Sequence, residues 1–189
     1  MVLGRINPFA SILFMSAESR NIVLLGFMGT GKTTVSQALA TELGYPAIDL
    51  DACIEAKAGR SIPEIFEQDG EDAFRALEHQ IVKEVASRRN QVISCGGGIV
   101  KNPANIDLLR ASGTLFCLTA TPETILERVG QETHRPLLAG ENRLDRIRIL
   151  LDERAPLYAQ IREQVATDGK TPQALAHEIL GRMLWPSGD

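Results

Sequence analysis

A phosphate-binding motif lies near the start of the chain. Residues 26–34 read GFMGTGKTT, which fits the pattern G-x-x-x-x-G-K-[ST]. The glycines of such a loop let backbone N–H groups turn toward phosphate oxygens. Lys32 is expected to reach the β- and γ-phosphates of a nucleotide, and the hydroxyl of Thr33 to bind Mg²⁺. The segment therefore predicts a nucleoside triphosphate site. The residues expected to contact the nucleotide there are Gly29, Thr30, Gly31, Lys32, Thr33 and Thr34.

Two carboxylates follow the next apolar segment. Asp49 and Asp51 are two residues apart where segment 45–49 ends, and an extended chain would point both side chains the same way. Beside a triphosphate, one carboxylate can hold the water shell of Mg²⁺ and the other can orient or deprotonate an acceptor hydroxyl. A pair of solvated acids in a turn is the alternative. Opposite a phosphate loop, the functional interpretation is favoured.

Glycines and arginines supply the other candidate groups. The triplet Gly96 to Gly98 has no side chain to pack, so it indicates either close approach of the backbone to a ligand or a flexible loop. Arg75, Arg135 and Arg154 could each grip carboxylate or phosphate oxygens with two planar hydrogen bonds. Taken singly, each arginine is more simply explained as a solvated surface residue.

The elements that must position these groups alternate between strands and helices. Short apolar segments predict strands at 21–25, 45–49, 91–95, 114–118 and 164–166. Periodic segments predict helices at 33–43, 52–57, from 61, 71–89, 102–111, from 121, 144–164 and 172–184. The alternation predicts a parallel sheet with helices on both faces. Ligands of such sheets collect at the carboxyl ends of the strands, where the phosphate loop, the acid pair and the glycine triplet all lie.

Local signals indicate several helix ends. Ser61 and Glu64 form a capping-box pattern, and Thr121 is placed to cap a helix that begins with a proline. The helix predicted at 71–89 would have Arg88 and Arg89 in its last turn, where its dipole favours cations.

Length and composition restrict the class of protein. The 189 residues suffice for one domain, predicted at 21–184. Residues 1–20 are expected to be a poorly ordered extension, 185–189 a tail, and the aperiodic stretch 130–142 a mobile lid. The net charge of −4 argues against a nucleic acid partner, and three cysteines favour a reducing compartment, which we expect to be the cytoplasm. No uninterrupted apolar stretch reaches the length of a membrane span, so we expect no membrane partner. A monomer is expected as well, although the sequence itself does not specify the oligomeric state.

From about residue 21 to 184 the sequence resembles the shikimate kinases. The matching pieces are GFMGTGKT at 26–33, DLD at 49–51, GRSIPEIF at 59–66, GEDAFRALE at 70–78, GGG at 96–98, HRPLL at 134–138 and ERAPLY at 153–158. The resemblance implies transfer of the ATP γ-phosphate to the 3-hydroxyl of shikimate, in the chorismate route to aromatic amino acids. It implies a three-layer α/β P-loop kinase fold of the nucleoside-monophosphate-kinase type. The five strands of its parallel sheet would follow the order 2-3-1-4-5.

The resemblance also implies roles for single residues. Asp49 would support Mg²⁺ through water, Asp51 would be the base that binds the acceptor hydroxyls, and Lys32 and Arg135 would act on the transferring phosphate. The residues implied in shikimate binding are Asp51, Arg75, Gly96, Gly97, Gly98, Arg154, Ile62, Phe66 and Phe74. Arg75 and Arg154 would clamp the shikimate carboxylate.

The adenine end of the site departs from the family pattern. Arg128 would lie over the adenine, and Arg135 would reach the γ-phosphate. Near Thr167 the family often carries a further arginine and an asparagine, whereas this chain has DGKTP at 168–172. Lys170 is the cation available there for ATP, and it cannot stack as a guanidinium does.

Three alternatives to shikimate phosphorylation remain open from the sequence. One is a kinase of gluconate or another small hydroxy acid, and a second is a nucleoside monophosphate kinase. The third is a nucleotide-dependent switch without turnover. GTPase switches need D-x-x-G and N-K-x-D, which the sequence lacks, and the groups that a catalytically dead relative would be expected to lose are present.

Overall fold

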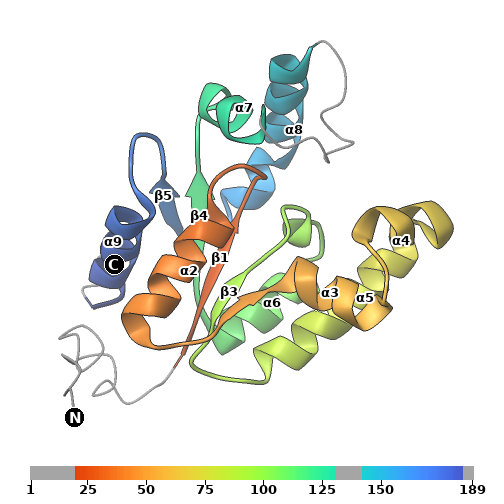
Figure 1. The fold of residues 1–189 in the computed structure, drawn as a ribbon, viewed down its shortest axis with the longest axis horizontal. Helices are drawn as coiled ribbons and strands as arrows, with labels where there is room; N and C mark the ends of the chain where they lie inside the picture. The colour runs from red at the N-terminus through yellow and green to blue at the C-terminus, as the bar shows by residue number, and fades with distance from the viewer. Residues whose placement is uncertain (1–19, 131–141, 185–189) are drawn as a thin grey trace.

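The computed structural model describes residues 20–130 and 142–184, and its centre is a five-stranded parallel sheet (Figure 1). The strands are β1 (Asn21–Gly26), β2 (Ala47–Asp49), β3 (Val92–Ser94), β4 (Gly113–Thr119) and β5 (Glu163–Ala166). Their order is β2-β3-β1-β4-β5, and every neighbouring pair is parallel, as the resemblance implied. The predicted extension, lid and tail lie outside the described residues, apart from Arg20, Gly130 and Asn142.

Helices follow each strand. They are α2 (Lys32–Leu43), α3 (Leu50–Ala58), α4 (Ile62–Gln68), α5 (Gly70–Ala86), α6 (Pro103–Ser112), α7 (Pro122–Gly130), α8 (Arg143–Tyr158) and α9 (Pro172–Leu184), with a 3₁₀ turn η1 (Ile99–Lys101). The predicted capping box is present, since Ser61 and Glu64 each bond the other's backbone N–H. Thr121 Oγ1 accepts from the backbone N–H of Thr124, which confirms the predicted cap of α7. In these ranges we find no helix with both the length and the apolar character of a membrane span.

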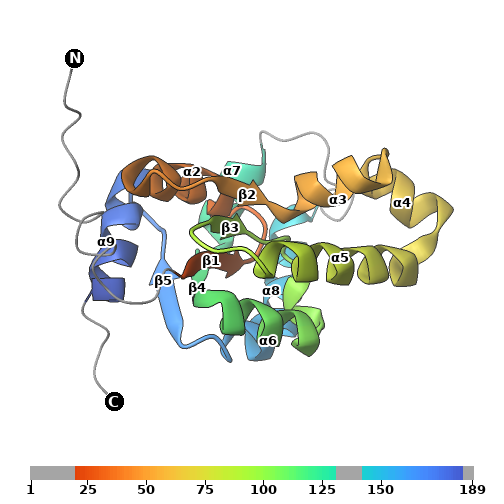
Figure 2. The same ribbon diagram turned by 90° about the horizontal axis from the view of Figure 1, so that it is seen from below.

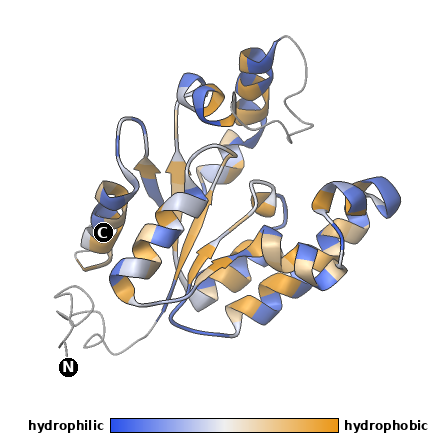
Figure 3. Ribbon diagram, in the orientation of Figure 1, coloured by the Kyte–Doolittle hydropathy of each residue, from blue (hydrophilic) through white to orange (hydrophobic). Residues whose placement is uncertain are grey.

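Alternate residues of β1 face the two sides of the sheet. Ile22 and Leu24 pack with α2 and α9, while Val23 and Leu25 pack with α5 and α6 on the opposite side (Figure 2). All four side chains are buried, and the strands form the apolar centre of the molecule (Figure 3). Burying each such side chain contributes roughly 1.5–3 kcal/mol. The sheet is therefore a stable frame for the groups at its carboxyl edge.

Two predicted helices are shorter than expected. Helix α5 ends at Ala86, so Arg88 and Arg89 do not lie in its last turn, and the basic residue there is Lys83. The Arg88 carbonyl instead accepts from Asn21 Nδ2 at 2.8 Å, which draws the chain toward β1.

The predicted helix 144–164 ends at Tyr158, and Pro156 lies within its last turn. Gln164 lies in β5 and donates from Nε2 to the Tyr158 carbonyl at 2.9 Å, which satisfies one of the helix's final acceptors.

Candidate active site

The phosphate loop joins β1 to α2 in a conformation that needs glycine. Gly29 and Gly31 have φ of 77° and 89°, in the left-handed region that side chains disfavour. The Phe27 carbonyl accepts from Thr30 Oγ1 at 2.8 Å and from Lys32 Nζ at 2.9 Å, which holds the loop closed. Because α2 begins at Lys32, its free N–H groups and positive dipole end face the loop. The predicted anion site is thus built by the backbone, with Lys32 inside it.

Thr33 and Asp49 meet beside this loop. Thr33 Oγ1 donates to Asp49 Oδ2 at 3.3 Å, and Asp49 Oδ1 accepts from the backbone N–H groups of Asp51 and Ala52 at 3.0 and 3.3 Å. Asp49 therefore caps α3, and Asp51 lies in the first turn of that helix. The prediction that both acids follow an extended chain is wrong, because the cap starts the helix one residue after Asp49. A hydroxyl and a carboxylate next to a phosphate site are the hard oxygen donors that suit Mg²⁺.

Asp51 is a half-buried acid in the same pocket as Lys32. Its pKa is raised to about 6, mainly by burial and also by the neighbouring Asp49 carboxylate, while the Lys32 ammonium opposes the change. Gly96 lies directly against it, since a Cβ at this position would overlap Asp51 Oδ1. At neutral pH the carboxyl is ionised and can accept a proton.

Arg75 lies at the other end of the glycine triplet. A Cβ at Gly98 would be 2.7 Å from Arg75 Nη2. Arg75 Nη1 donates to both carboxylate oxygens of buried Glu78, at 3.0 and 2.9 Å, and Nη2 donates to Glu71 at 3.2 Å. The guanidinium carbon is 5.0 Å from the centre of the Phe74 ring.

Glu78 is a site residue that the sequence reasoning missed. Burial raises the pKa of Glu78, and the bonds from Arg75 oppose this change. The available signal was the i, i+3 spacing of arginine and glutamate within GEDAFRALE.

Arg154, on α8, lies beside Gly97, the middle glycine of the triplet. Its Nη1 donates to the Gly97 carbonyl at 3.4 Å, and its guanidinium carbon is 5.4 Å from the centre of the Phe27 ring. Tyr158 donates to the same carbonyl at 2.7 Å. The glycine triplet is therefore bordered by Asp51, Arg154 and Arg75, one beside each glycine. The structure brings together Asp51 and two of the three arginines singled out from the sequence, Arg75 and Arg154.

The apolar residues assigned to the acceptor pocket lie on α4 and α5. The Phe66 and Phe74 rings are 4.6 Å apart, and Phe74, the neighbour of Arg75, is buried. Ile62 packs at the edge of the core and begins α4. Phe66 is 38% exposed, so part of its apolar surface lies open next to Phe74, the ring that the Arg75 guanidinium covers.

On the nucleotide side, Arg128 ties two loops together. Its Nη1 donates to the Gly29 carbonyl at 3.2 Å and to Thr167 Oγ1 at 2.9 Å. Lys170 pairs with Glu178 at 2.7 Å. Arg135 lies outside the described residues. Arg128 and Lys170 both face the pocket that the phosphate loop lines, as the predicted nucleotide contacts should.

That pocket has a volume of about 530 Å³ and extends from the nucleotide loops to the acid pair. It is lined by Met28, Gly29, Thr30, Gly31, Lys32, Thr33, Thr34, Val35, Asp49, Asp51, Ser94, Cys95, Gly96, Gly97, Arg128, Lys170, Pro172 and Leu175. A phosphate loop after β1, acids after β2 and this sheet order define a P-loop kinase fold.

Comparisons with known proteins identify the kinase. A family model described as shikimate kinase matches residues 28–184. A curated shikimate kinase of Thermodesulfovibrio yellowstonii is 44% identical over 161 residues, 85% of this chain and 93% of that protein. The solved structure of shikimate kinase from Acinetobacter baumannii in complex with shikimate has a TM-score of 0.85 and 36% identity, covering 93% of this chain and 97% of that one. This chain belongs to the shikimate kinase family. Its activity is the ATP-dependent phosphorylation of shikimate at the 3-hydroxyl, a step of chorismate and aromatic amino acid biosynthesis.

A gluconokinase from Sinorhizobium meliloti is a more distant match. It has a TM-score of 0.57 and 18% identity, and covers 88% of this chain and 94% of that one. This likeness shows a shared fold and gives no information on the acceptor substrate.

Proposed function

We propose that this chain binds shikimate against the glycine triplet, with Asp51 at the acceptor hydroxyl and Arg75 and Arg154 at the carboxylate. The observation that carries the proposal is that these three side chains border consecutive glycines, Asp51 at Gly96 and Arg75 at Gly98. A ring bearing one carboxylate and several hydroxyls would meet two cations at one end and one carboxylate at the other. Planar two-bond contacts from arginine suit the carboxylate.

In the proposed reaction, Asp51 accepts the proton of the 3-hydroxyl as its oxygen attacks the γ-phosphorus of ATP. The new O–P bond forms as the bond between the γ-phosphorus and the β–γ bridging oxygen breaks, and ADP leaves. Lys32 stabilises the negative charge on the transferring phosphoryl group from within the phosphate loop. The raised pKa of Asp51, about 6, makes it a better proton acceptor than an ordinary aspartate and leaves it ionised at pH 7.

We also propose that Mg²⁺ accompanies ATP. Thr33 would hold the ion and Asp49 would hold its water shell, because the hydroxyl and the carboxylate lie 3.3 Å apart beside the loop. When bound, the ion neutralises charge on the β- and γ-phosphates. Arg128 and Lys170 would contact the nucleotide, and from the family resemblance alone Arg135 would reach the γ-phosphate.

We further infer that the protein is a monomer of the cytoplasm and acts on small molecules, without a nucleic acid or membrane partner. It would form one domain over 21–184, with a lid at 130–142. All three cysteines are free thiols, and Cys95 and Cys117 are buried, which suits a reducing compartment. In the described ranges the exposed large hydrophobic side chains are Phe66, in the proposed acceptor site, and Ile149 on α8. Two such side chains, on different helices, give no sign of an oligomer interface within the described ranges, which supports the proposed monomer.

The test is turnover with a panel of acceptors. Purified protein would be mixed with ATP and Mg²⁺ and with shikimate, gluconate or a nucleoside monophosphate, and the products followed by ³¹P NMR. We expect shikimate 3-phosphate and ADP to form, with kcat/KM for shikimate at least about 100-fold above that for gluconate. The shikimate ring fixes the distance between carboxylate and hydroxyl, whereas the open chain of gluconate must be ordered on binding. Faster turnover with gluconate would overturn the acceptor assignment.

A further inference from the structure

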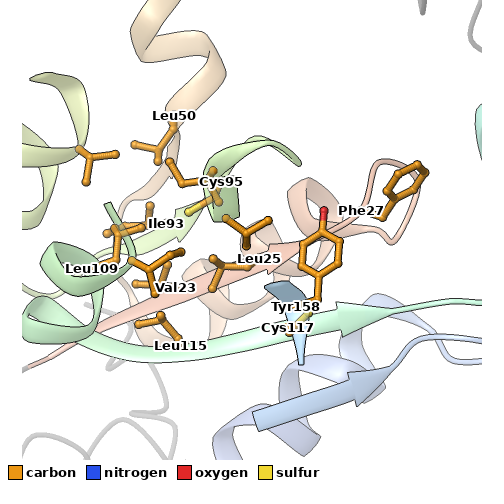
Figure 4. Close-up of a cluster of buried hydrophobic side chains, with 14 of the residues drawn as sticks. Val23, Leu25, Phe27, Leu50, Ile93, Cys95, Leu109, Leu115, Cys117 and Tyr158 are labelled. Carbon is orange, nitrogen blue, oxygen red and sulfur yellow. The ribbon is translucent and has the colours of Figure 1, made fainter. Parts of the chain in front are cut away.

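The Gly97 carbonyl is an acceptor shared by two side chains of α8. Tyr158 donates its hydroxyl proton at 2.7 Å, and Arg154 donates from Nη1 at 3.4 Å. The two residues are four apart, so they lie on one face of the helix, and the Arg154 charge acts on the Tyr158 hydroxyl. The Tyr158 ring is buried beside Leu25, with its hydroxyl directed away from Cys117 (Figure 4).

The two hydrogen bonds are unequal. At 2.7 Å the tyrosine bond has the ordinary length for an O–H donor, whereas 3.4 Å is beyond the usual range for an N–H donor. A guanidinium that turns its Nη1 and Nη2 edge toward a carboxylate can form two parallel bonds, and the long Nη1 contact to the Gly97 carbonyl is then weakened further. If Arg154 were the main donor to this half-buried carbonyl, turning toward a carboxylate would cost it that hydrogen bond.

We propose that Tyr158 is a positioning residue for acceptor binding, which keeps the Gly97 carbonyl bonded and so frees Arg154 to bind the carboxylate of shikimate. The inference rests on the proposed role of Arg154 as a carboxylate ligand. Burial raises the pKa of Tyr158 to about 12, so the hydroxyl keeps its proton and remains a donor at any pH used to assay the enzyme.

The first test is Tyr158→Phe, which removes one hydroxyl and keeps the ring in the core. Arg154 is then the remaining side-chain donor to the Gly97 carbonyl, and binding shikimate costs it that hydrogen bond. We expect KM for shikimate to rise about 5- to 10-fold, with KM for ATP within about twofold of the wild-type value. The matched control is Tyr45→Phe, the other tyrosine of the chain, which packs with the α2 and α9 side of the sheet and should change neither constant. Equal effects of the two substitutions would overturn the proposal.

A double-mutant cycle separates this role from simple support of the loop. Arg154→Ala alone tests the proposed function, because it should raise KM for shikimate, and no change would remove the carboxylate assignment. In the Arg154→Ala background, Tyr158→Phe should add less than about a twofold increase, since no guanidinium remains to be released. If the full 5- to 10-fold effect persists there, Tyr158 acts only on the loop and the proposal fails.

A second probe applies if Tyr158→Phe unfolds at the assay temperature. Placing 3,5-difluorotyrosine at position 158 keeps the ring and the hydroxyl but lowers the pKa of the phenol. Once ionised, the phenol cannot donate to the Gly97 carbonyl. KM for shikimate should then rise with pH in the fluorinated protein and not in the unmodified one, and identical pH profiles would refute the inference.

Discussion

The Arg75 guanidinium packs directly on the backbone of Gly98: a Cβ at that position would lie 2.7 Å from Nη2 and 3.0 Å from Nη1. Gly96 has the same relation to Asp51. Gly98 has a φ of −93°, and neither Gly96 nor Gly97 has the left-handed backbone that would itself require glycine. Gly96 and Gly98 therefore lack side chains because the Asp51 carboxylate and the Arg75 guanidinium occupy that space, whereas a Cβ at Gly97 would make only ordinary contacts.

Gly98→Ala should displace Arg75 without altering the fold of the sheet. We expect kcat/KM for shikimate to fall roughly 10- to 100-fold, because a misplaced carboxylate ligand misaligns the acceptor. Steady-state kinetics with each substrate varied in turn would measure this, and KM for ATP should stay within about twofold. The control is Gly181→Ala, in α9, where an added Cβ meets nothing within 4 Å. A similar loss in both variants would contradict the steric explanation.

The fold could be predicted because its signals are local and repeated. Strand segments such as 21–25 are apolar runs, and the caps at Ser61 and Thr121 use short-range hydrogen bonds. The end of α5 at Ala86 was not predicted. After it, the Arg88 carbonyl accepts a hydrogen bond from Asn21, 67 positions earlier in the chain, where the prediction had continued the helix. Such contacts between distant segments leave no periodic trace in a sequence.

The site was predictable where residue types alone carry the chemistry, as at Lys32 and Asp51. Glu78 was missed because a glutamate on a helix looks solvated in sequence, and only packing of α5 shows it to be buried against Arg75. The hydrogen bond from Tyr158 was missed because its partner is a backbone carbonyl 61 residues away.

Asp51→Asn should remove the proposed general base while keeping the shape of the site. We expect kcat to fall about 10²- to 10⁴-fold, with the affinity for ATP retained in calorimetry. In the wild-type enzyme, kcat/KM for shikimate should fall tenfold per pH unit below about 6, as the carboxyl becomes protonated. A flat profile between pH 5 and 7 would be inconsistent with Asp51 as the base.

The same substitution should stabilise the folded protein at neutral pH. The pKa of Asp51 rises from 3.8 to about 6 on folding, so the folded state disfavours the ionised carboxylate. Above pH 6 this costs stability, by up to about 3 kcal/mol, and below pH 4 the carboxyl is protonated in both states and the cost vanishes. Urea unfolding of the Asn variant and the wild type should therefore differ at pH 8 and converge at pH 3.5. Equal free energies of unfolding at pH 8 would show that burial does not destabilise the ionised Asp51 carboxylate.

Asp168 should support nucleotide binding from the adenine loop. Its Oδ1 accepts from the backbone N–H of Thr121 at 2.9 Å and from the Thr121 hydroxyl at 2.8 Å, and the Thr121 N–H is the main cause that lowers its pKa to about 2. Its stabilising effect is present above pH 3.8 and is lost as pH falls toward 2. Asp168→Ala should cost roughly 1 kcal/mol of stability and raise KM for ATP about 3- to 10-fold. Asp107→Ala, which removes an exposed aspartate of α6, is the control. A selective rise in KM for shikimate would contradict the assignment.

The most direct test of the central claim is Arg75→Lys, measured by steady-state kinetics with shikimate and ATP varied separately. The lysine keeps the positive charge but loses the planar pair of hydrogen bonds to a carboxylate. KM for shikimate should rise about 10-fold or more, while KM for ATP stays within about twofold. A variant with weaker ATP binding and unchanged KM for shikimate would show that Arg75 is not a ligand of the acceptor carboxylate.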